Sequence, residues 1–360
     1  MADESEPHGY TYPNTSDDPD QRDVLRNKFD LRSHEALRRA EYRLTNNRRA
    51  ELDLGQGPRG SFDAAHLKAI HKHLFSQVYE WAGHTRDERP IVDGLPVEPV
   101  GGLHKGGTSF LHGSRIGMGL EEALRPIRDP DALKGLTFTE FAEVAGRVLS
   151  ELNYVHPFRE GNGRTQEAFI AELGRHVGHD VDFSVMTKPR MIAASIASTN
   201  DPDSPAMRTL MEDAVDPGRV WALRETFESL RQQGENPYDH DVKAARPGET
   251  VSGAVLGKGV EAASLVTKQG IVAVPLADLT PAQLASQDDI TVNIRSGFTA
   301  RPGAAVSTER AETSADDRAR SYWQRAADSG AEIRQGDRQA REGEGAEQGQ
   351  AHRAGRYRAR

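Results

Sequence analysis

The feature that most constrains this 360-residue chain is a ten-residue run, HPFREGNGRT, at His156–Thr165. Before it, residues from Thr137 onward predict a long helix. Glu140 completes a capping box with Thr137, and apolar residues then recur at helical spacing up to the run. After it, residues 164–178 have a second helical pattern. The run is therefore expected to form a short loop between two helices, and the first helix would hold that loop rigid.

The loop has the parts of a phosphate-binding site. Gly161 and Gly163 permit backbone angles that residues with a Cβ avoid, so successive N–H groups can turn inward and form an anion-binding nest. The loop also opens onto the N-terminus of the next helix, where N–H groups and the helix dipole favour phosphate. Arg159 and Arg164 can add forked, charge-assisted contacts to phosphate oxygens.

Two more side chains of the loop indicate a reaction. Glu160 would repel bound phosphates unless a cation lay between, and Mg²⁺ is the natural mediator, held by one carboxylate, phosphate oxygens and water. His156 titrates near neutrality and can remove the proton from an incoming hydroxyl. Together these residues describe the transfer of a phosphate-linked group to an alcohol.

The alternative is an ordinary helix–turn–helix connection, in which glycine stops one helix and Asn162 caps the next. This alternative explains the glycines, but not a histidine, a carboxylate and two arginines within the same ten positions. A Walker-type phosphate loop is excluded, because the chain contains no GxxxxGK[ST].

The run resembles the signature of the Fic family, HPFx[D/E]GNGRxxR, and matches it at every specified position except the last. The resemblance implies a protein adenylyltransferase, which moves AMP from ATP onto a Ser, Thr or Tyr hydroxyl of a target protein with the help of Mg²⁺. By position, His156 would be the general base, Glu160 the Mg²⁺ ligand and Phe158 a core anchor. The implied phosphate cradle comprises Gly161, Asn162, Gly163 and Arg164.

The departure from the family is Glu167, which stands where the second arginine is expected. In the family that arginine reaches the terminal phosphate of ATP and, in inhibited members, pairs with an inhibitory glutamate. Three interpretations are open. Glu167 can pair harmlessly with Arg164, three residues earlier on the helix. Alternatively, it weakens ATP use or selects a different donor, or it abolishes activity.

Composition excludes several classes of protein. The 46 Lys and Arg against 55 Asp and Glu give a net charge of −9, which argues against nucleic-acid binding through bulk charge. The absence of cysteine excludes a disulfide framework and thiol catalysis. The N-terminus lacks the pattern of a signal peptide, and no apolar run approaches the roughly 20 residues that span a bilayer. We therefore expect a soluble, cytoplasmic protein with no membrane partner.

The pattern divides the chain into five regions. They are an irregular N-terminal segment (1–30), a mainly helical Fic domain (31–217), a helix and linker (218–245), a small β domain (246–298) and a charged tail (299–360). The expected fold class is mainly α, with a β-hairpin flap in the Fic domain.

Within the helical region, residues 63–82 have apolar side chains at spacings of three and four, which predicts a helix. It carries His66, His71 and His73, whose spacing misses that of an i,i+4 metal pair, so no metal site is expected there.

Residues 86–100 predict a β-hairpin, because short apolar runs flank the turn pair Asp93-Gly94. In the Fic family a hairpin flap clamps the target segment by main-chain pairing, which places its hydroxyl in line with the α-phosphate. The alternative is an ordinary surface hairpin, since prolines at positions 90, 96 and 99 limit the pairing.

The C-terminal part changes in character. Short β-branched runs such as TVSGAVL, GIVAV and ITVNIR predict a small antiparallel barrel of the OB type, similar to the module after the Fic domain of secreted bacterial effectors. It has no aromatic ladder or basic stripe, so we expect a structural or docking role and no direct nucleic-acid binding. The tail carries 11 arginines and 10 acidic residues from Thr308 onward and predicts disorder. It is either a plain solvated tail or a type IV secretion signal.

Regulation and targets follow from the resemblance alone. The chain contains no [S/T]xxxE[G/N], the inhibitory string of many Fic proteins, so a separate small antitoxin would supply restraint, or none is needed. Similarity to two-gene Fic toxins implies a bacterial toxin that acts on the ATPase subunits of type II topoisomerases. Two other functions stay open: a Fic enzyme that transfers UMP, phosphate or phosphocholine, and a non-catalytic binding module of a conjugation or secretion system. The target residue and the oligomeric state are left open.

Overall fold

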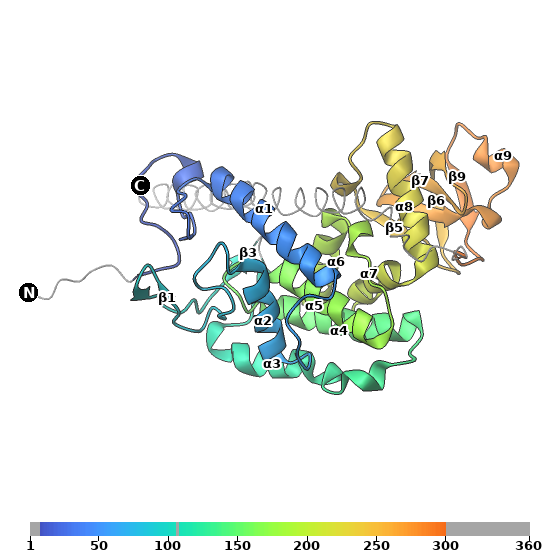
Figure 1. The fold of residues 1–360 in the computed structure, drawn as a ribbon. Helices are drawn as coiled ribbons and strands as arrows, with labels where there is room; N and C mark the ends of the chain where they lie inside the picture. Colours follow the sequence, from blue (N-terminus) through green and yellow to red (C-terminus); the bar gives the residue numbers. More distant parts are fainter. Residues whose placement is uncertain (1–7, 106–107, 300–360) are drawn as a thin grey trace, which may run out of the picture.

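The computed structural model describes residues 8–105 and 108–299, so the predicted tail from residue 300 onward lies outside it. A helical region comes first along the chain, and a small sheet follows at the right of Figure 1, which confirms the expected fold class. The helices are α1 (His34–Asp53), α2 (Ala64–Phe75), α3 (Ile116–Leu124), α4 (Phe138–Val155), α5 (Asn162–Val177), α6 (Lys188–Asn200), α7 (Ala206–Val215), α8 (Pro217–Gln232) and α9 (Pro281–Leu284). The strands are β1 (Ile91–Val92), β2 (Leu95–Pro96), β3 (His104–Lys105), β4 (Thr108–Ser109), β5 (Val242–Ala244), β6 (Thr250–Lys258), β7 (Ala262–Thr267), β8 (Gly270–Pro275) and β9 (Ile290–Asn293). Short 3-10 helices lie at Pro19–Gln21, Gly113–Arg115, Arg125–Ile127, Pro130–Leu133, Phe183–Val185, Pro237–Asp239 and Leu276–Asp278.

Helix α4 leads into the loop and begins with the predicted capping box. The Thr137 hydroxyl accepts from the Glu140 N–H (3.3 Å), and the Glu140 carboxylate accepts from the Thr137 N–H (2.8 Å). Its buried side includes Phe141, Ala145, Val148, Leu152 and Val155. At Gly146, α4 crosses α7 so closely that an added Cβ would lie 2.8 Å from the Arg208 backbone. The helix that ends at the loop is therefore clamped within the helical region.

Helix α2 is shorter than the predicted 63–82, because it ends at Phe75. Beyond that point Val78, Tyr79 and Trp81 are all buried, with 0 to 1% exposure. A helix would bury one face only, whereas the observed turns direct these neighbouring side chains into the core together. The spacing of apolar residues in the sequence did not distinguish one continuous helix from a helix followed by turns.

The sheet has the strand order β5-β8-β7-β6-β9, with β5 parallel to β8 and the other neighbours antiparallel. Its first strand, β5, begins before the predicted boundary at residue 246. Helix α8 covers one face, where the Ser264 hydroxyl donates to Thr226 (3.0 Å). The other face has its own core, which includes Leu265, Val272 and Val274. Successive side chains of β7 point to opposite faces of the sheet. The strand therefore contributes Ser264 to the contact with α8 and Leu265 to the core on the other face.

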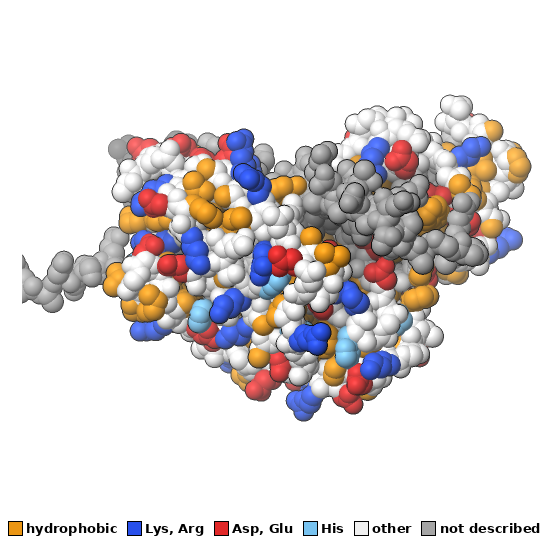
Figure 2. All heavy atoms as spheres, viewed as in Figure 1, with side chains coloured by type: hydrophobic (Ala, Val, Ile, Leu, Met, Phe, Trp, Pro, Cys, Tyr) orange, Lys and Arg blue, Asp and Glu red, His pale blue; other side chains and the backbone are white. Residues whose placement is uncertain are grey.

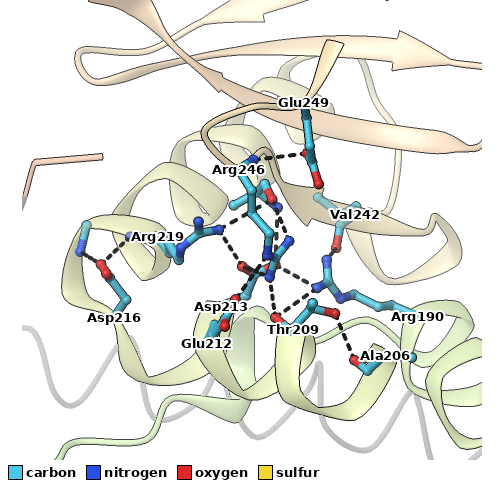
Figure 3. A network of polar contacts seen from close by, with 12 residues as sticks. Arg190, Ala206, Thr209, Glu212, Asp213, Asp216, Arg219, Val242, Arg246 and Glu249 are labelled. Atoms are coloured by element: carbon cyan, nitrogen blue, oxygen red, sulfur yellow. Dashed lines mark hydrogen bonds and ion pairs between the residues drawn. The ribbon is translucent and has the colours of Figure 1, made fainter. Parts of the chain in front are cut away.

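A buried charge network connects the sheet to the helices (Figure 3). Asp213 of α7 has no exposed surface. Its carboxylate lies 2.7 Å from Arg190 of α6, 2.9 Å from Arg219 of α8 and 3.1 Å from Arg246, which follows β5. Arg246 also pairs with Glu212 at 3.0 Å. Because each partner comes from a different element, the network fixes the sheet against the helical region.

The surface in Figure 2 carries Lys and Arg side chains interspersed with Asp and Glu, as the nearly balanced composition suggests. Within the part of the chain that the structure describes, no helix is both long and apolar enough to cross a membrane.

Candidate active site

His156 directly follows α4 and leaves the helix in a left-handed conformation. Its φ is 45° and its ψ is 60°, a combination that a residue with a Cβ adopts where its surroundings enforce it. Its N–H donates to the Leu152 carbonyl (3.0 Å), and its carbonyl accepts from the Arg86 Nε (3.0 Å). The imidazole is half-buried and stacks on Phe110, with 3.9 Å between the ring centroids. These contacts hold the predicted base at a sharp exit from the helix.

Phe158 and Asn162 close the loop on itself. The Asn162 Oδ1 accepts from the Phe158 N–H (2.9 Å), and its Nδ2 donates to the Phe158 carbonyl (2.8 Å). The Phe158 ring is fully buried, as expected of a core anchor. Since the Asn162 side chain holds the loop, the group it can offer directly to a phosphate is its backbone N–H at the start of α5.

His71 supports the loop from α2. Its Nδ1 accepts from the Gly83 N–H (2.8 Å), so the ring proton lies on Nε2, which donates to the Glu160 carbonyl (3.1 Å). The ring stacks on Phe158, with 3.9 Å between centroids and 10° between planes. Burial lowers the pKa of His71 to about 3, so the side chain is neutral. His71 therefore supports the loop as a neutral side chain that stacks on Phe158 and donates to the Glu160 carbonyl.

The two glycines of the motif differ. Gly161 has a φ of 82°, and an added Cβ would lie 2.5 Å from the Phe75 ring, so glycine is required there on both counts. Gly163 lies inside α5 without a positive φ, which corrects the expectation of a special backbone angle, and an added Cβ would meet nothing within 4 Å. The first bond of α5 runs from the Thr165 N–H to the Gly161 carbonyl (3.1 Å). The Gly163 amide precedes that bond and has no acceptor within the helix.

Arg164 is held between two carboxylates. Its Nη1 lies 2.5 Å from Glu41 of α1, and its Nη2 lies 3.7 Å from Glu160. The guanidinium also covers the Phe75 ring at 4.5 Å from the centroid, and the side chain is 11% exposed. The predicted phosphate-binding arginine is thus part of an ion-pair network that reaches α1.

Glu160 is the candidate Mg²⁺ ligand. Its side chain is 42% exposed, and one carboxylate oxygen accepts from the Gly161 N–H (3.0 Å). Across residues 8–105 and 108–299, no group of three or more His, Cys, Asp or Glu side chains is placed to hold a metal ion. The single carboxylate of Glu160 fits an Mg²⁺ ion that would arrive with a nucleotide and be held also by phosphate oxygens and water.

Arg159 and Glu167 are the remaining motif residues. Arg159 lies near Tyr10 of the N-terminal segment. Burial raises the pKa of Tyr10 to about 12, and the charge of Arg159 opposes that rise. Glu167 is half-buried on α5, one turn after Arg164. The phosphate contact of Arg159 and the effect of Glu167 stay predictions.

Two hairpins lie between α2 and α3. The predicted one is confirmed: β1 pairs with β2, and the turn residues Asp93 and Gly94 have φ values of 51° and 79°. However, the hairpin that reaches the loop is the second, β3–β4, because Phe110 just after it stacks on His156. The sequence interpretation missed this hairpin. Its signal was the Gly-Gly pair at 106–107, which lies between polar strands without the usual apolar flanks.

Four residues that support the loop were not assigned that role from the sequence: Glu41, His71, Arg86 and Phe110. His71 and Arg86 lie in the stretch HKHLFSQVYEWAGHTR, which contains several other polar residues, so nothing in the sequence singles them out. Glu41 and Phe110 have no local signal, since each contacts the loop from a distant segment.

Comparison with known proteins agrees with this geometry. The profile of the Fic/DOC family matches residues 61–173. The chain is 34% identical over 281 residues to a protein adenylyltransferase of Bartonella henselae, a match that covers 77% of this chain and 50% of that protein. The chain thus spans about half the length of that relative. It is also 36% identical over 179 residues to a probable protein adenylyltransferase, y4lH, of Sinorhizobium fredii, covering 49% of this chain and 83% of that protein.

Solved structures extend the similarity to the sheet. The type IV secretion system effector protein BepA has a TM-score of 0.71 and 31% identity, and the match covers 81% of this chain and 98% of that one. BepC from Bartonella tribocorum, with bound AMPPNP, has a TM-score of 0.52 and 33% identity over 57% of this chain and 95% of its own. The motif, the fold around it and the match over most of y4lH lead to one conclusion: this chain belongs to the Fic/DOC family.

Proposed function

We propose that this protein is a protein adenylyltransferase, which moves AMP from ATP to a Ser, Thr or Tyr hydroxyl of a target protein. The observation that carries the proposal is the loop between α4 and α5, which presents His156 and the Glu160 carboxylate beside the N-terminus of α5. The names of the relatives support this activity. ATP as donor is supported by two similar structures, one with bound AMPPNP and one with bound ADP.

In the proposed reaction the target hydroxyl oxygen attacks the α-phosphorus of ATP. The bond from the α-phosphorus to the bridging oxygen breaks, pyrophosphate leaves, and the His156 imidazole takes the hydroxyl proton. The amide of Gly163 and the guanidinium of Arg164 contact the phosphates, while Glu160 holds Mg²⁺, which neutralises phosphate charge when bound. Because the backbone of His156 is already fixed by Leu152 and Arg86, little reorganisation is needed.

The test is transfer of label from ATP carrying it on the α-phosphate to proteins of a bacterial lysate. We expect His156→Ala to lower the rate about 10²–10⁴-fold, the usual contribution of general-base catalysis. The matched control is His176→Ala, at the far end of α5, where the histidine pairs with Asp131 at 2.8 Å. Equal labelling by wild type and His156→Ala would refute the mechanism, and no labelling by wild type would favour a non-catalytic binding module.

Glu167 motivates a second candidate, a Fic enzyme with another donor such as UMP, phosphate or phosphocholine. Parallel incubations with separately labelled donors decide between the candidates. A Glu167→Arg variant should bind ATP more tightly if Glu167 limits contact with the terminal phosphate. An unchanged affinity would show that Glu167 has no effect on donor binding.

At the level of the cell we infer a cytoplasmic toxin whose target is an ATPase subunit of a type II topoisomerase, restrained by a separate small antitoxin. The second possibility, an effector exported by type IV secretion, is favoured by the similarity to BepA over 98% of that chain. Purified topoisomerase subunits incubated with this protein and α-labelled ATP test the first role. Labelling of a eukaryotic lysate but not of these subunits would support the second.

A further inference from the structure

Arg86 is a buried charge without an ion-pair partner among the described residues. Its side chain has no exposed surface. Burial lowers the pKa of Arg86, and the nearby Asp87 carboxylate opposes this, but a guanidinium keeps its proton at physiological pH. A buried cation is stable only if its donors find acceptors, so the acceptors of Arg86 explain why it is there.

The acceptors of Arg86 are all backbone carbonyls. Its Nε donates to His156 (3.0 Å), and its Nη1 donates to Val100 and Gly101 (2.8 Å each). Its Nη2 donates to Leu111. The planar fork of a guanidinium can reach carbonyls on several sides at once, whereas an ammonium group is a single point.

These carbonyls belong to two parts of the site. Val100 and Gly101 precede β3, and Leu111 follows β4, so they are the two ends of the hairpin whose Phe110 stacks on His156. The ends are joined to each other, because the Gly113 N–H donates to the Gly101 carbonyl (2.7 Å).

The other part is the exit of α4. The Arg86 N–H donates to the Pro157 carbonyl (2.8 Å), and its Nη2 lies 3.5 Å from the Val155 carbonyl. The Leu111 N–H donates to the Tyr154 carbonyl (3.0 Å), which adds a direct link between hairpin and helix. One side chain therefore spans the hairpin and the strained exit that carries His156.

We propose that Arg86 is a positioning residue, which fixes the β3–β4 hairpin and the backbone of His156 relative to each other. The inference rests on the proposed function, in which His156 is the base, and it adds that the hairpin and the base move as one unit. A target segment that docks on the hairpin then has its hydroxyl at a constant distance from the imidazole. A displacement of even about 1 Å in such an arrangement can cost roughly 10²-fold in rate.

The test compares wild type with Arg86→Lys. The lysine keeps the charge but cannot serve both parts of the site. The matched control is Arg89→Lys, where the arginine is 62% exposed and lies 2.9 Å from Glu98. Amide hydrogen exchange is measured in the full chain for residues 100–112 and 153–158, with β6 to β8 as the internal reference. In Arg86→Lys we expect both segments to exchange at least about tenfold faster, the factor that corresponds to one lost hydrogen bond to a charged group.

Activity and nucleotide binding are measured on the same variants. The rate of label transfer from ATP should fall about tenfold or more. The Kd for AMPPNP with Mg²⁺ should change less than about twofold, because the Arg86 side chain is buried and donates to backbone carbonyls. Faster exchange in only one segment, in neither, or across the reference strands would overturn the proposal. So would loosening of both segments with an unchanged rate of transfer. Hydrogen exchange does not depend on activity. If the wild type transfers no label, the proposed function fails, but the exchange rates still decide whether Arg86 couples the hairpin to the backbone of His156.

If Arg86→Lys does not fold, Gly113→Ala replaces it. An added Cβ there would lie 2.6 Å from the Val100 carbonyl, one of the acceptors of Arg86, and would push the hairpin end away without changing Arg86 itself. The same paired increase in exchange at residues 100–112 and 153–158 is expected. An increase confined to residues 100–112 would contradict the coupling.

Discussion

The Glu41 carboxylate of α1 lies 2.5 Å from the Arg164 guanidinium of α5, and both side chains are nearly buried, with 13% and 11% exposure. The buried Tyr79 hydroxyl donates to the same carboxylate. Helix α1 is thus connected to the start of α5, directly after the loop, through one ion pair.

Glu41→Gln removes the charge of this pair and keeps its shape. We expect a loss of about 1–3 kcal/mol in the free energy of unfolding, because a poorly solvated guanidinium loses its charged acceptor. Glu122→Gln is the matched control, since its partner Arg125 is also at 2.5 Å, but both side chains are more than half exposed. Exposed pairs contribute little, so the control should change stability only slightly. Urea unfolding curves provide the comparison, and equal losses in the two variants would contradict the prediction.

The two glycines of the loop predict opposite results. Gly163→Ala places its Cβ in open space within a helix and should raise stability by about 0.5–1 kcal/mol. If the Gly163 amide binds phosphate, the same methyl group should raise the Kd for AMPPNP about tenfold or more, the equivalent of one lost hydrogen bond to a charged group. Thermal unfolding and nucleotide titration measure the two effects. An unchanged Kd would show that phosphate does not approach at this residue.

Gly161→Ala is the counterpart. Its Cβ would lie 2.5 Å from the Phe75 ring, at a residue with a φ of 82°. We expect a loss of roughly 1–3 kcal/mol from backbone strain and overpacking. A variant as stable as wild type would mean that the loop adapts more easily than the packing suggests.

Tyr10 is 4% exposed, and its hydroxyl has no hydrogen-bond partner among the described residues. Tyr10→Phe should therefore change stability at neutral pH by less than about 1 kcal/mol, since no hydrogen bond is lost. The control is Tyr79→Phe, which loses the bond to Glu41 and should cost about 1.5–3 kcal/mol. Unfolding measurements at neutral pH would contradict this account if Tyr10→Phe were the more damaging change.

Tyr10 also predicts a pH dependence. Its burial raises its pKa from 10.0 to about 12 in the folded protein. A raised pKa means that the folded protein favours the neutral hydroxyl. The contribution of neutral Tyr10 to the free energy of unfolding is therefore complete below pH 10 and is lost as the pH rises from about 10 to about 12. The difference in stability between wild type and Tyr10→Phe should shift against wild type across that range. A constant difference from pH 8 to 12 would show that the hydroxyl ionises in the folded protein as easily as in the unfolded chain.

Asp213→Asn tests the network in Figure 3. The carboxylate is fully buried and pairs with Arg190, Arg219 and Arg246, so its neutralisation leaves a buried excess of positive charge. We expect a loss of about 3–5 kcal/mol. Asp53→Asn is the control, because that side chain is 57% exposed and lies 3.4 Å from Arg49. A loss below about 1 kcal/mol for Asp213→Asn would mean that the arginines are satisfied by the carbonyls around them.

The sequence alone was sufficient for the local features of this protein. The capping box at Thr137, the helix that follows it and the turn at Asp93-Gly94 depend on neighbours within a few positions, and each formed as predicted. The fold class could be predicted for the same reason, since periodic apolar residues specify which elements form. The motif from His156 to Thr165 is also local, because helix, loop and next helix follow one another directly.

Only the tertiary structure decided what surrounds the loop. Glu41 and Arg164, His71 and Glu160, and Arg86 and His156 are pairs from distant segments, and no periodicity records which of them will meet. Packing also decided that Gly163 would lie in an ordinary helical turn and that the hairpin beside His156 would be β3–β4. Hydrogen bonds and ion pairs between distant residues depend on how the helices stack, and stacking is set by the shape of the whole core.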